Sequence, residues 1–237
     1  MNQSHLFAVE AVDHVITSRR SIRAFLDQPI PEETLKTILK VASRAPSGSN
    51  TQPWKVYVAR GQTRQQIIDQ VCQAQQQLNQ QPELAVNYQA SFAYYPEKWF
   101  SPYIERRREN GLGLYGLLGI LKGEKDKMAA QHLRNYQLFD APVVMFLTVH
   151  QDLGVGAKMD ASMLMQNIML AAKARGIDSC PQAAWNHFHS LVLPLLQASP
   201  EEELVCAIAL GYADPDAVVN QFQTPRAAVD EFSVFLD

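Results

Sequence analysis

The chain has 237 residues, of which 47% are hydrophobic and 19% are charged, a composition that suits one large domain with a substantial core. Its net charge is −3, so no global field attracts nucleic acid or an acidic membrane surface. Any site for an anionic ligand must therefore come from a local cluster of basic residues.

The cysteines and the first residues indicate the compartment. Cys72, Cys180 and Cys206 lie far apart and form no CxxC pair, which argues against a disulfide framework and against a structural zinc site. The start of the chain lacks the basic and apolar regions of a secretory signal, and no stretch approaches the roughly 18 apolar residues of a membrane span. We expect a cytoplasmic protein with no metal, nucleic-acid or membrane partner.

The spacing of apolar residues in the first part of the chain predicts mainly helices. Helical patterns cover residues 8–16, 31–44 and 62–80, and alternation over residues 55–59 predicts a strand. Residues 82–102 show no period and are rich in aromatic side chains. Helical patterns resume over residues 103–121 and 125–138.

The second part begins with a buried strand at residues 143–147. Residues 157–175 follow as a helix that is apolar on nearly every face, which predicts burial in the core. The pattern then predicts a short strand at 177–179, a helix at 189–197, a strand at 204–210 and a tail from residue 212. We predict one α+β domain over residues 1–237.

Residues 18–23 could bind an anion. They read Ser-Arg-Arg-Ser-Ile-Arg and gather three guanidinium groups and two hydroxyl groups at a helix end. Arginine can grip a phosphate with two parallel hydrogen bonds, although a solvated basic turn has the same composition. An extended backbone around Ile22 would point Arg19, Ser21 and Arg23 in one direction.

Residues 45–54 form a second segment dense in hydrogen-bonding groups. They read Ala-Pro-Ser-Gly-Ser-Asn-Thr-Gln-Pro-Trp, between a predicted helix and a predicted strand. Each amide side chain offers a donor and an acceptor, which suits the polar edge of a flavin or a base. A simple turn between the two elements is the alternative.

These segments carry a resemblance to a known family. RRSIR, PSGSNTQPW, SCPQAA and the tail GYADPDAVVNQFQTPRAAVDEF follow one another as in the nitroreductase family of FMN enzymes, and the chain most resembles its nitrobenzoate-reductase subgroup. The resemblance extends over essentially the whole chain. It implies a nitroreductase-like FMN-binding α+β fold with a central mixed sheet flanked by helices. It also implies an intertwined homodimer with two flavins at the interface.

The resemblance implies a set of cofactor-binding residues. FMN would be held through its phosphate and ring edge by Arg19, Arg20, Ser21, Arg23 and Arg226. The partner subunit would contribute Pro46, Ser47, Gly48, Asn50 and Gln52. Along the flavin would run Pro181, Gln182, Ala183 and Ala184, with the backbone N–H of Ala183 or a neighbour near the flavin N5.

Two departures from the family pattern affect this set. Many relatives carry Glu-Gly where this chain has Ala183-Ala184, so a backbone donor survives here but a glutamate side chain does not. Some relatives carry a lysine at the position of Thr224, so phosphate binding would depend more on the arginines.

The activity that the resemblance implies is a ping-pong transfer of electrons. NADH or NADPH would reduce the flavin and leave before an oxidised small aromatic acceptor, a nitroaromatic or a quinone, enters the same face. The flavin carries the redox chemistry, which explains why the sequence needs no catalytic triad and no obligate general acid. Two alternatives remain: a reductive dehalogenase of the iodotyrosine deiodinase kind, and a non-catalytic FMN-binding protein for sensing or storage.

Several other segments receive weaker interpretations. Residues 82–122 are expected to form a variable substrate lid, and residues 212–237 a tail that wraps a partner subunit or packs on its own domain. Arg106, Arg107 and Arg108 either attract an acidic acceptor or form a solvated helix face. The methionines of residues 159–169 suit a core, and we assign no metal-binding role to the histidines at 132, 187 and 189.

Overall fold

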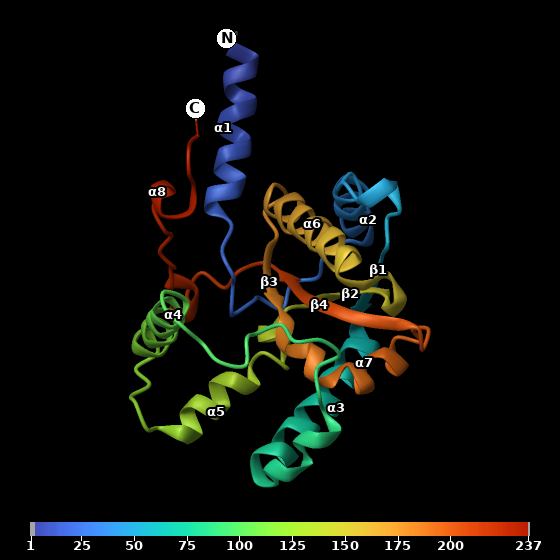
Figure 1. Cartoon of the computed structure of the whole chain (residues 1–237), viewed down its shortest axis with the longest axis vertical. Helices are drawn as coiled ribbons and strands as arrows, with labels where there is room; N and C mark the ends of the chain where they lie inside the picture. Colours follow the sequence, from blue (N-terminus) through green and yellow to red (C-terminus); the bar gives the residue numbers. More distant parts are fainter. Residues whose placement is uncertain (1–2, 237) are drawn as a thin grey trace.

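The computed structural model describes residues 3–236, so residues 1, 2 and 237 of the expected domain lie outside the described part (Figure 1). The helices are α1 (Gln3–Ser18), α2 (Glu32–Ala42), α3 (Gly61–Gln80), α4 (Tyr103–Leu117), α5 (Lys125–Leu133), α6 (Gly154–Lys173), α7 (His189–Leu195) and α8 (Val229–Phe232). The strands are β1 (Trp54–Arg60), β2 (Val143–His150), β3 (Asp178–Gln182) and β4 (Glu202–Gly211). The α+β class is confirmed, and no described helix has both the length and the apolar character to span a membrane.

The four strands form one sheet in the order β1-β2-β4-β3. Every pairing between these strands is antiparallel, with Trp54 opposite Val149 and Val143 opposite Leu210. The mixed character expected of the sheet is therefore limited, within residues 3–236, to one isolated parallel bridge between Ser21 and Ser179. The reason is that β4 inserts between β2 and β3, which run in the same direction and would otherwise pair in parallel.

Helices cover both faces of the sheet, which makes three layers (Figure 1). Helices α2 and α6 lie on one face, where Met145 and Leu147 of β2 join their core. Helices α3 and α7 lie on the other face, where Val144 and Phe146 of β2 point. Strand β2 is thus buried on both sides, which is why its sequence reads as a continuous apolar run.

Helix α6 differs from the prediction of a helix buried all round. One side packs on the sheet, whereas Val155, Met159 and Met163 on the other side are 74%, 65% and 38% exposed. These three residues recur at helical spacing and form an apolar stripe that no other described residue buries. The methionines at 159 and 163 are therefore not core residues of a single chain. Sequence periodicity could not reveal this, because a second apolar face reads like a buried one.

Other boundaries shift for local reasons. Helix α4 ends earlier than predicted, at Leu117, just before Gly119 with its positive φ of 66°. Helix α5 ends at Leu133, ahead of residues 138–140, whose positive φ angles a helix cannot hold. Strand β3 extends beyond its predicted end through Pro181 and Gln182. Proline is tolerated there because β3 is an edge strand.

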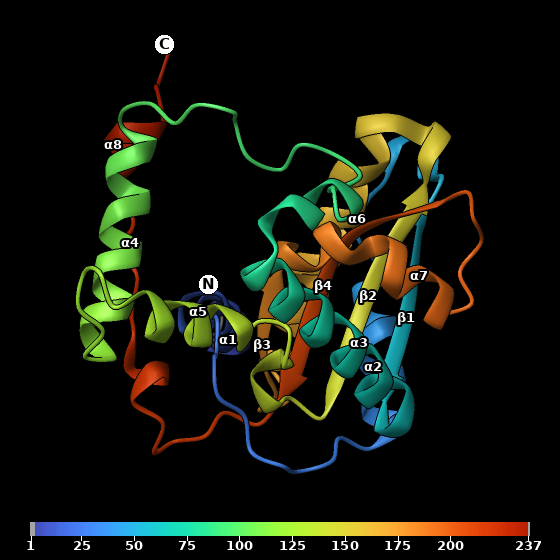
Figure 2. The ribbon, with the colours of Figure 1, turned by 90° about the horizontal axis from the view of Figure 1, so that it is seen from below.

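Helix α4 and the C-terminal tail form a separate column beside the sheet (Figure 2). The ring of Phe222 lies so close to Gly113 of α4 that a Cβ atom at this glycine would come within 2.8 Å of it. Arg106 of α4 forms an ion pair with Glu231 of α8 at 3.2 Å. The predicted lid helix and the predicted tail are therefore held to each other.

Candidate functional site

The arginines near the start of the chain meet the tail in one cavity of about 480 Å³, which we call the arginine cavity. Its lining includes Arg19, Arg20, Ser21, Arg23 and Arg226, and also Ile16, Thr17, Phe222, Gln223 and Thr224. The structure thus brings together all five residues expected at the phosphate end. Arg20 lines the cavity with its neighbours, so the strict alternation expected for Arg19, Ser21 and Arg23 is not kept.

Backbone pairing positions the arginine segment. Helix α1 ends at Ser18, and the chain then passes along β3, where the N–H of Ile22 donates to the carbonyl of Ser179 at 3.0 Å. Ile22 itself is buried in the core, which fixes the direction of its neighbours. The basic side chains on either side of it are consequently left at the surface of the sheet edge.

Asn220 ties the tail to this segment, and sequence reasoning missed it. Its Oδ1 accepts from the backbone N–H groups of Arg23 and Ala24 at 2.8 and 3.2 Å. Its Nδ2 donates to the carbonyls of Ala24 and Asp214 at 2.8 and 2.9 Å. The sequence around Asn220 does not reveal its four hydrogen bonds, because its partners lie up to 197 positions away.

The four guanidinium groups of the arginine cavity have no acidic partner among residues 3–236. The Arg23 guanidinium donates to the carbonyl of Ser21 at 3.3 Å, and that of Arg226 donates to Thr224 and to the carbonyl of Pro225. Partial burial lowers the pKa of Arg19, and the charge of Arg226 lowers it further. This concentration of unneutralised charge in a protein of net charge −3 is the environment that an anion such as a phosphate ester requires.

Buried polar atoms without partners lie next to the arginine cavity. The hydroxyl groups of Ser18 and Ser179 have no hydrogen bond within the described chain. The nearby thiol of Cys180 is not a nucleophile, because burial raises its pKa to about 11 even though Arg23 and Arg19 lower it. The cavity is thus built for binding an anion rather than for covalent chemistry.

The segment at residues 181–184 lines a second, larger cavity of about 700 Å³, which we call the aromatic cavity. Pro181 and Gln182 reach it from the edge strand, and Ala183 and Ala184 from the 3₁₀-helix Ala183–Phe188. The first N–H groups of such a helix have no partner within it, which leaves the N–H of Ala183 without a helical acceptor. Gln182 donates to the carbonyl of Asn135 at 2.7 Å, while its own Oε1 is buried without a partner.

The rest of the aromatic cavity comes from the expected lid and from residues that the sequence did not single out. The lid contributes Tyr88, Phe92, Tyr94 and Tyr95, whereas its later aromatic residues lie elsewhere. The unpredicted lining residues include His132, Asn135, Tyr136 and His187. Asn186 anchors the lid, because its Oδ1 accepts from the N–H and the hydroxyl of Ser91 at 2.8 and 3.1 Å.

The loop at residues 46–52 does not line either of these cavities. It is held to α6 by a hydrogen bond from the N–H of Gly48 to Asp160 at 3.1 Å, and Gln52 N–H donates to the Ser47 hydroxyl at 2.9 Å. Asn50 and Gln52 adopt left-handed backbone conformations, which non-glycine residues rarely do. Pro46, Gly48, Asn50 and Gln52 are exposed, as a role toward a second subunit would require.

Other basic residues and polar candidates are accounted for by local contacts. Arg106 pairs with Glu231, and Arg107 lies 5.1 Å from the centre of the Trp99 ring. Asn167 donates to the carbonyl of Ala42, which favours a structural role. Within residues 3–236, no group of three or more His, Cys, Asp or Glu side chains could hold a metal ion.

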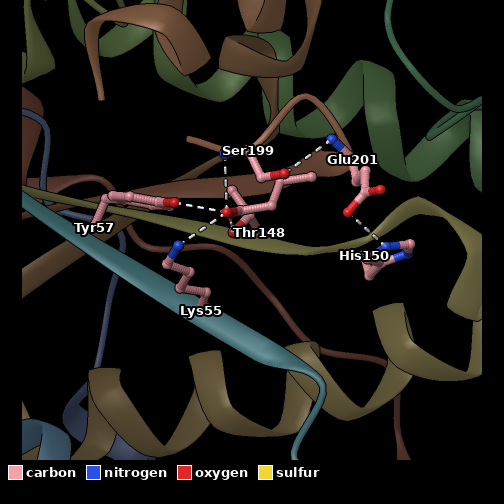
Figure 3. Close-up of polar contacts among 7 residues, drawn as sticks. Lys55, Tyr57, Thr148, His150, Ser199 and Glu201 are labelled. Carbon is pink, nitrogen blue, oxygen red and sulfur yellow. Dashed lines mark hydrogen bonds and ion pairs between the residues drawn. The ribbon is translucent and has the colours of Figure 1, made fainter. Parts of the chain in front are cut away.

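A further polar cluster lies at the far end of the sheet. Unlike the arginine cavity, it holds charged groups that are paired with one another. In the Glu202 cluster, the carboxylate of Glu202 accepts from Lys55, Tyr57, Thr148 and the Ser199 N–H, at 2.5–3.2 Å. Figure 3 shows Lys55, Tyr57 and Thr148 pointing toward one another from neighbouring strands. Burial raises the pKa of Glu202, but these hydrogen bonds outweigh that effect and hold the pKa at about 2. Every charge here is satisfied, so the cluster is structural.

Comparison with known proteins identifies the family to which this chain belongs. A model of the nitroreductase family matches residues 16–212. The 4-nitrobenzoate reductase of Nocardioides sp. is 36% identical over 230 residues, which cover 97% of this chain and 91% of that protein. The FMN-dependent nitroreductase NfnB from Mycobacterium smegmatis, solved in complex with NADPH, superposes with a TM-score of 0.90 at 31% identity over 97% of this chain and 100% of that one. The chain belongs to the nitroreductase family.

The deiodinase resemblance is partial. An iodotyrosine deiodinase of Nematostella vectensis is 31% identical over 87 residues, which cover 37% of this chain and 33% of that protein. The shared part is too short to carry an activity across.

Proposed function

We propose that this protein is an FMN-dependent oxidoreductase that passes electrons from NADH or NADPH to nitroaromatic or quinone-type acceptors. The observation that carries this proposal is the arginine cavity. Its four guanidinium groups have no acidic partner within residues 3–236, which leaves them able to bind an anion. The full-length similarity to a 4-nitrobenzoate reductase supports the acceptor class. The similarity to an NADPH-bound FMN nitroreductase supports the cofactor and the donor.

The residues present fit FMN. Arg19, Arg20, Arg23 and Arg226 would hold its phosphate, and Ser21 would add a hydroxyl donor. The partnerless hydroxyl groups of Ser18 and Ser179 and the partnerless Oε1 of Gln182 are further polar atoms that a bound polar group would satisfy. Bound FMN would supply the chemistry of hydride acceptance and electron donation.

The protein's own task at the redox end is binding and orientation. The N–H of Ala183 would orient the flavin ring, and no side chain at positions 183–184 can transfer a proton because both are alanine. The aromatic cavity would receive donor and acceptor in turn, and its tyrosine and phenylalanine rings would stack on flat substrates and exclude water. Protons for the acceptor would come from solvent.

We further propose that the protein works as a cytoplasmic homodimer. The free thiols Cys72, Cys180 and Cys206 support a reducing compartment. Apolar side chains that no described residue covers include Phe7 and Val12 of α1, Met159 of α6, and Phe232 and Phe235 of the tail. A second copy would bury this surface and bring the loop at 46–52 to the partner's flavin.

The chemistry of the aromatic cavity disfavours an amino-acid substrate such as an iodotyrosine. That substrate carries an ammonium group, and no Asp or Glu lines the cavity to pair with it. Nitroaromatics and quinones, which are flat and carry oxygen acceptors, fit this lining better.

The test is to purify the protein, measure its flavin content and oligomeric state, and follow flavin reduction by NADH and by NADPH without oxygen. We expect a yellow dimer that either nicotinamide bleaches and that nitroaromatic or quinone acceptors recolour. A colourless protein that takes up no FMN on reconstitution would refute the proposal. A yellow protein that neither nicotinamide reduces would support the binding or sensing role instead.

A further inference from the structure

The aromatic cavity has a lining without acidic or strongly basic side chains. Of the residues that line it, none is Asp, Glu, Lys or Arg, so it carries no permanent charge. Burial raises the pKa of Tyr136 and of Tyr94, so these two phenols stay neutral at physiological pH. The groups in the lining that can become cationic are therefore two imidazoles, those of His132 and His187.

Both imidazoles are available to a ligand. His132 comes from α5 and His187 from the 3₁₀-helix Ala183–Phe188, so two separate elements bring them to one cavity. Neither ring forms a hydrogen bond or an ion pair within residues 3–236. The His132 ring packs against Tyr136 in a T-shaped arrangement with centroids 5.7 Å apart.

The two imidazoles influence each other. Partial burial lowers the pKa of His132, and the proximity of His187 lowers it further. Around them the cavity presents only the phenol groups of Tyr88, Tyr94, Tyr95 and Tyr136 as further titratable groups. An anion within hydrogen-bond reach of His132 would offset this effect and favour the protonated form of its imidazole.

We propose that His132 and His187 form the substituent-binding end of the acceptor pocket and select aromatic acceptors that carry a carboxylate. This inference rests on the proposed function for the identity of the acceptor. Each protonated imidazole donates a charge-assisted hydrogen bond to the carboxylate, while the aromatic rings of the cavity hold the ring of the acceptor. Both histidines are specificity-determining residues of the acceptor site.

A binding measurement tests the inference without turnover. The imidazole C–H signals of His132 and His187 are followed by NMR against pH, with benzoate, with benzamide and with neither, each variant His→Gln serving for assignment. We expect benzoate to raise the pKa of both imidazoles and benzamide to leave it unchanged. Benzoate that moves neither signal, at concentrations well above those used in turnover, would overturn the inference.

A kinetic measurement then tests selectivity. The ratio of kcat/KM for 4-nitrobenzoate to that for nitrobenzene should fall about tenfold as pH rises through the histidine range in the wild-type protein. In the double variant His132→Gln, His187→Gln, which keeps donors but loses the charge, the ratio should start about tenfold lower at acid pH and stay flat with pH.

His189→Gln is the matched control, because this histidine lies on α7 and does not line the cavity. It should keep the wild-type ratio and pH profile. A double variant with the wild-type ratio and slope would show that the imidazoles do not bind the acceptor. Failure of the proposed function would give another result, because neither acceptor would then be reduced and no flavin would be retained. The NMR titration with benzoate would still test whether the two imidazoles bind a carboxylate.

Discussion

The arginine cavity and the Glu202 cluster both gather polar side chains beside the same sheet, yet their charged groups are paired in opposite ways. In the arginine cavity, four like charges lie together with no acidic partner among the described residues. In the Glu202 cluster, one carboxylate accepts four hydrogen bonds and has lysine beside it. A charge left without an internal partner marks a place for a ligand, whereas a charge with a full set of partners stabilises the fold.

The largest expected effect follows from removing the unpaired charges. The double variant Arg23→Ala, Arg226→Ala should lower FMN affinity by well over tenfold, since each charge-assisted contact contributes about 1.5–3 kcal/mol. Its apoprotein should unfold at the same or a higher urea concentration, because like charges have been removed. Fluorescence titration with FMN and urea unfolding measure the two quantities.

The control for this variant is Arg108→Ala, which removes an exposed arginine of α4 that lines neither cavity. It should leave both FMN affinity and stability unchanged. If the double variant keeps wild-type affinity, the arginine cavity is not the phosphate site.

Asn220 should contribute both to the stability of the fold and to the binding of the ligand, so its removal should lower both. Asn220→Ala loses three hydrogen bonds between the tail and the arginine segment and one within the tail, so we expect a loss of about 1–3 kcal/mol in the free energy of unfolding. FMN affinity should fall as well, since Arg226 is no longer held beside Arg23. Asn79→Ala, an exposed asparagine of α3, should change neither quantity. Lower stability with full affinity would show that the arginines need no such tie.

The Glu202 cluster should respond to mutation in the reverse manner. Glu202→Gln is expected to lower the free energy of unfolding by about 1–3 kcal/mol and to leave FMN affinity unchanged. Its neighbour Glu201 pairs with His150 at the surface, 65% exposed, so Glu201→Gln should cost less than about 1 kcal/mol. If the two variants lower the free energy of unfolding equally, the hydrogen bonds to Glu202 stabilise the fold no more than the exposed ion pair of Glu201 does.

The smallest effect is a dependence of stability on pH. The pKa of Glu202 is about 2 in the folded protein against an ordinary value of 4.5, so its contribution is present above pH 4.5 and is lost as pH falls toward 2. Urea midpoints of the apoprotein measured between about pH 6 and pH 3 should therefore fall more steeply for the wild type than for Glu202→Gln. Parallel curves would assign the acid sensitivity to other carboxylates.

Local features of the site were readable from the sequence. The cluster Arg19–Arg23, the helix before it and the buried strand β2 depend on neighbouring residues, and all lie where the pattern predicts them. The family resemblance added Arg226, which no local pattern would have joined to the arginines. Most helices were also predicted within a few residues of their bounds.

Features that depend on distant parts of the chain were not readable. Nothing near Asn220 shows that it bonds to Ala24, and nothing near His132 shows that it shares a cavity with His187. The strand order likewise depends on which distant strands meet, so the pattern could not exclude a mixed sheet. The apolar stripe of α6 looked like a core face because apolar spacing does not tell a core from an interface between subunits.

The hydrogen bond from the Arg23 N–H to the Asn220 side chain also has a consequence for synthesis on the ribosome, because it joins residues 197 positions apart. Arg19, Arg20 and Arg23 leave the exit tunnel early, while Arg226 follows only after the whole sheet has been made. These three arginines remain exposed and repel one another until the tail around Arg226 completes the cavity. A released chain that ends before residue 220 should therefore hold the sheet but no closed anion site, because it contains all four strands and lacks Asn220 and Arg226.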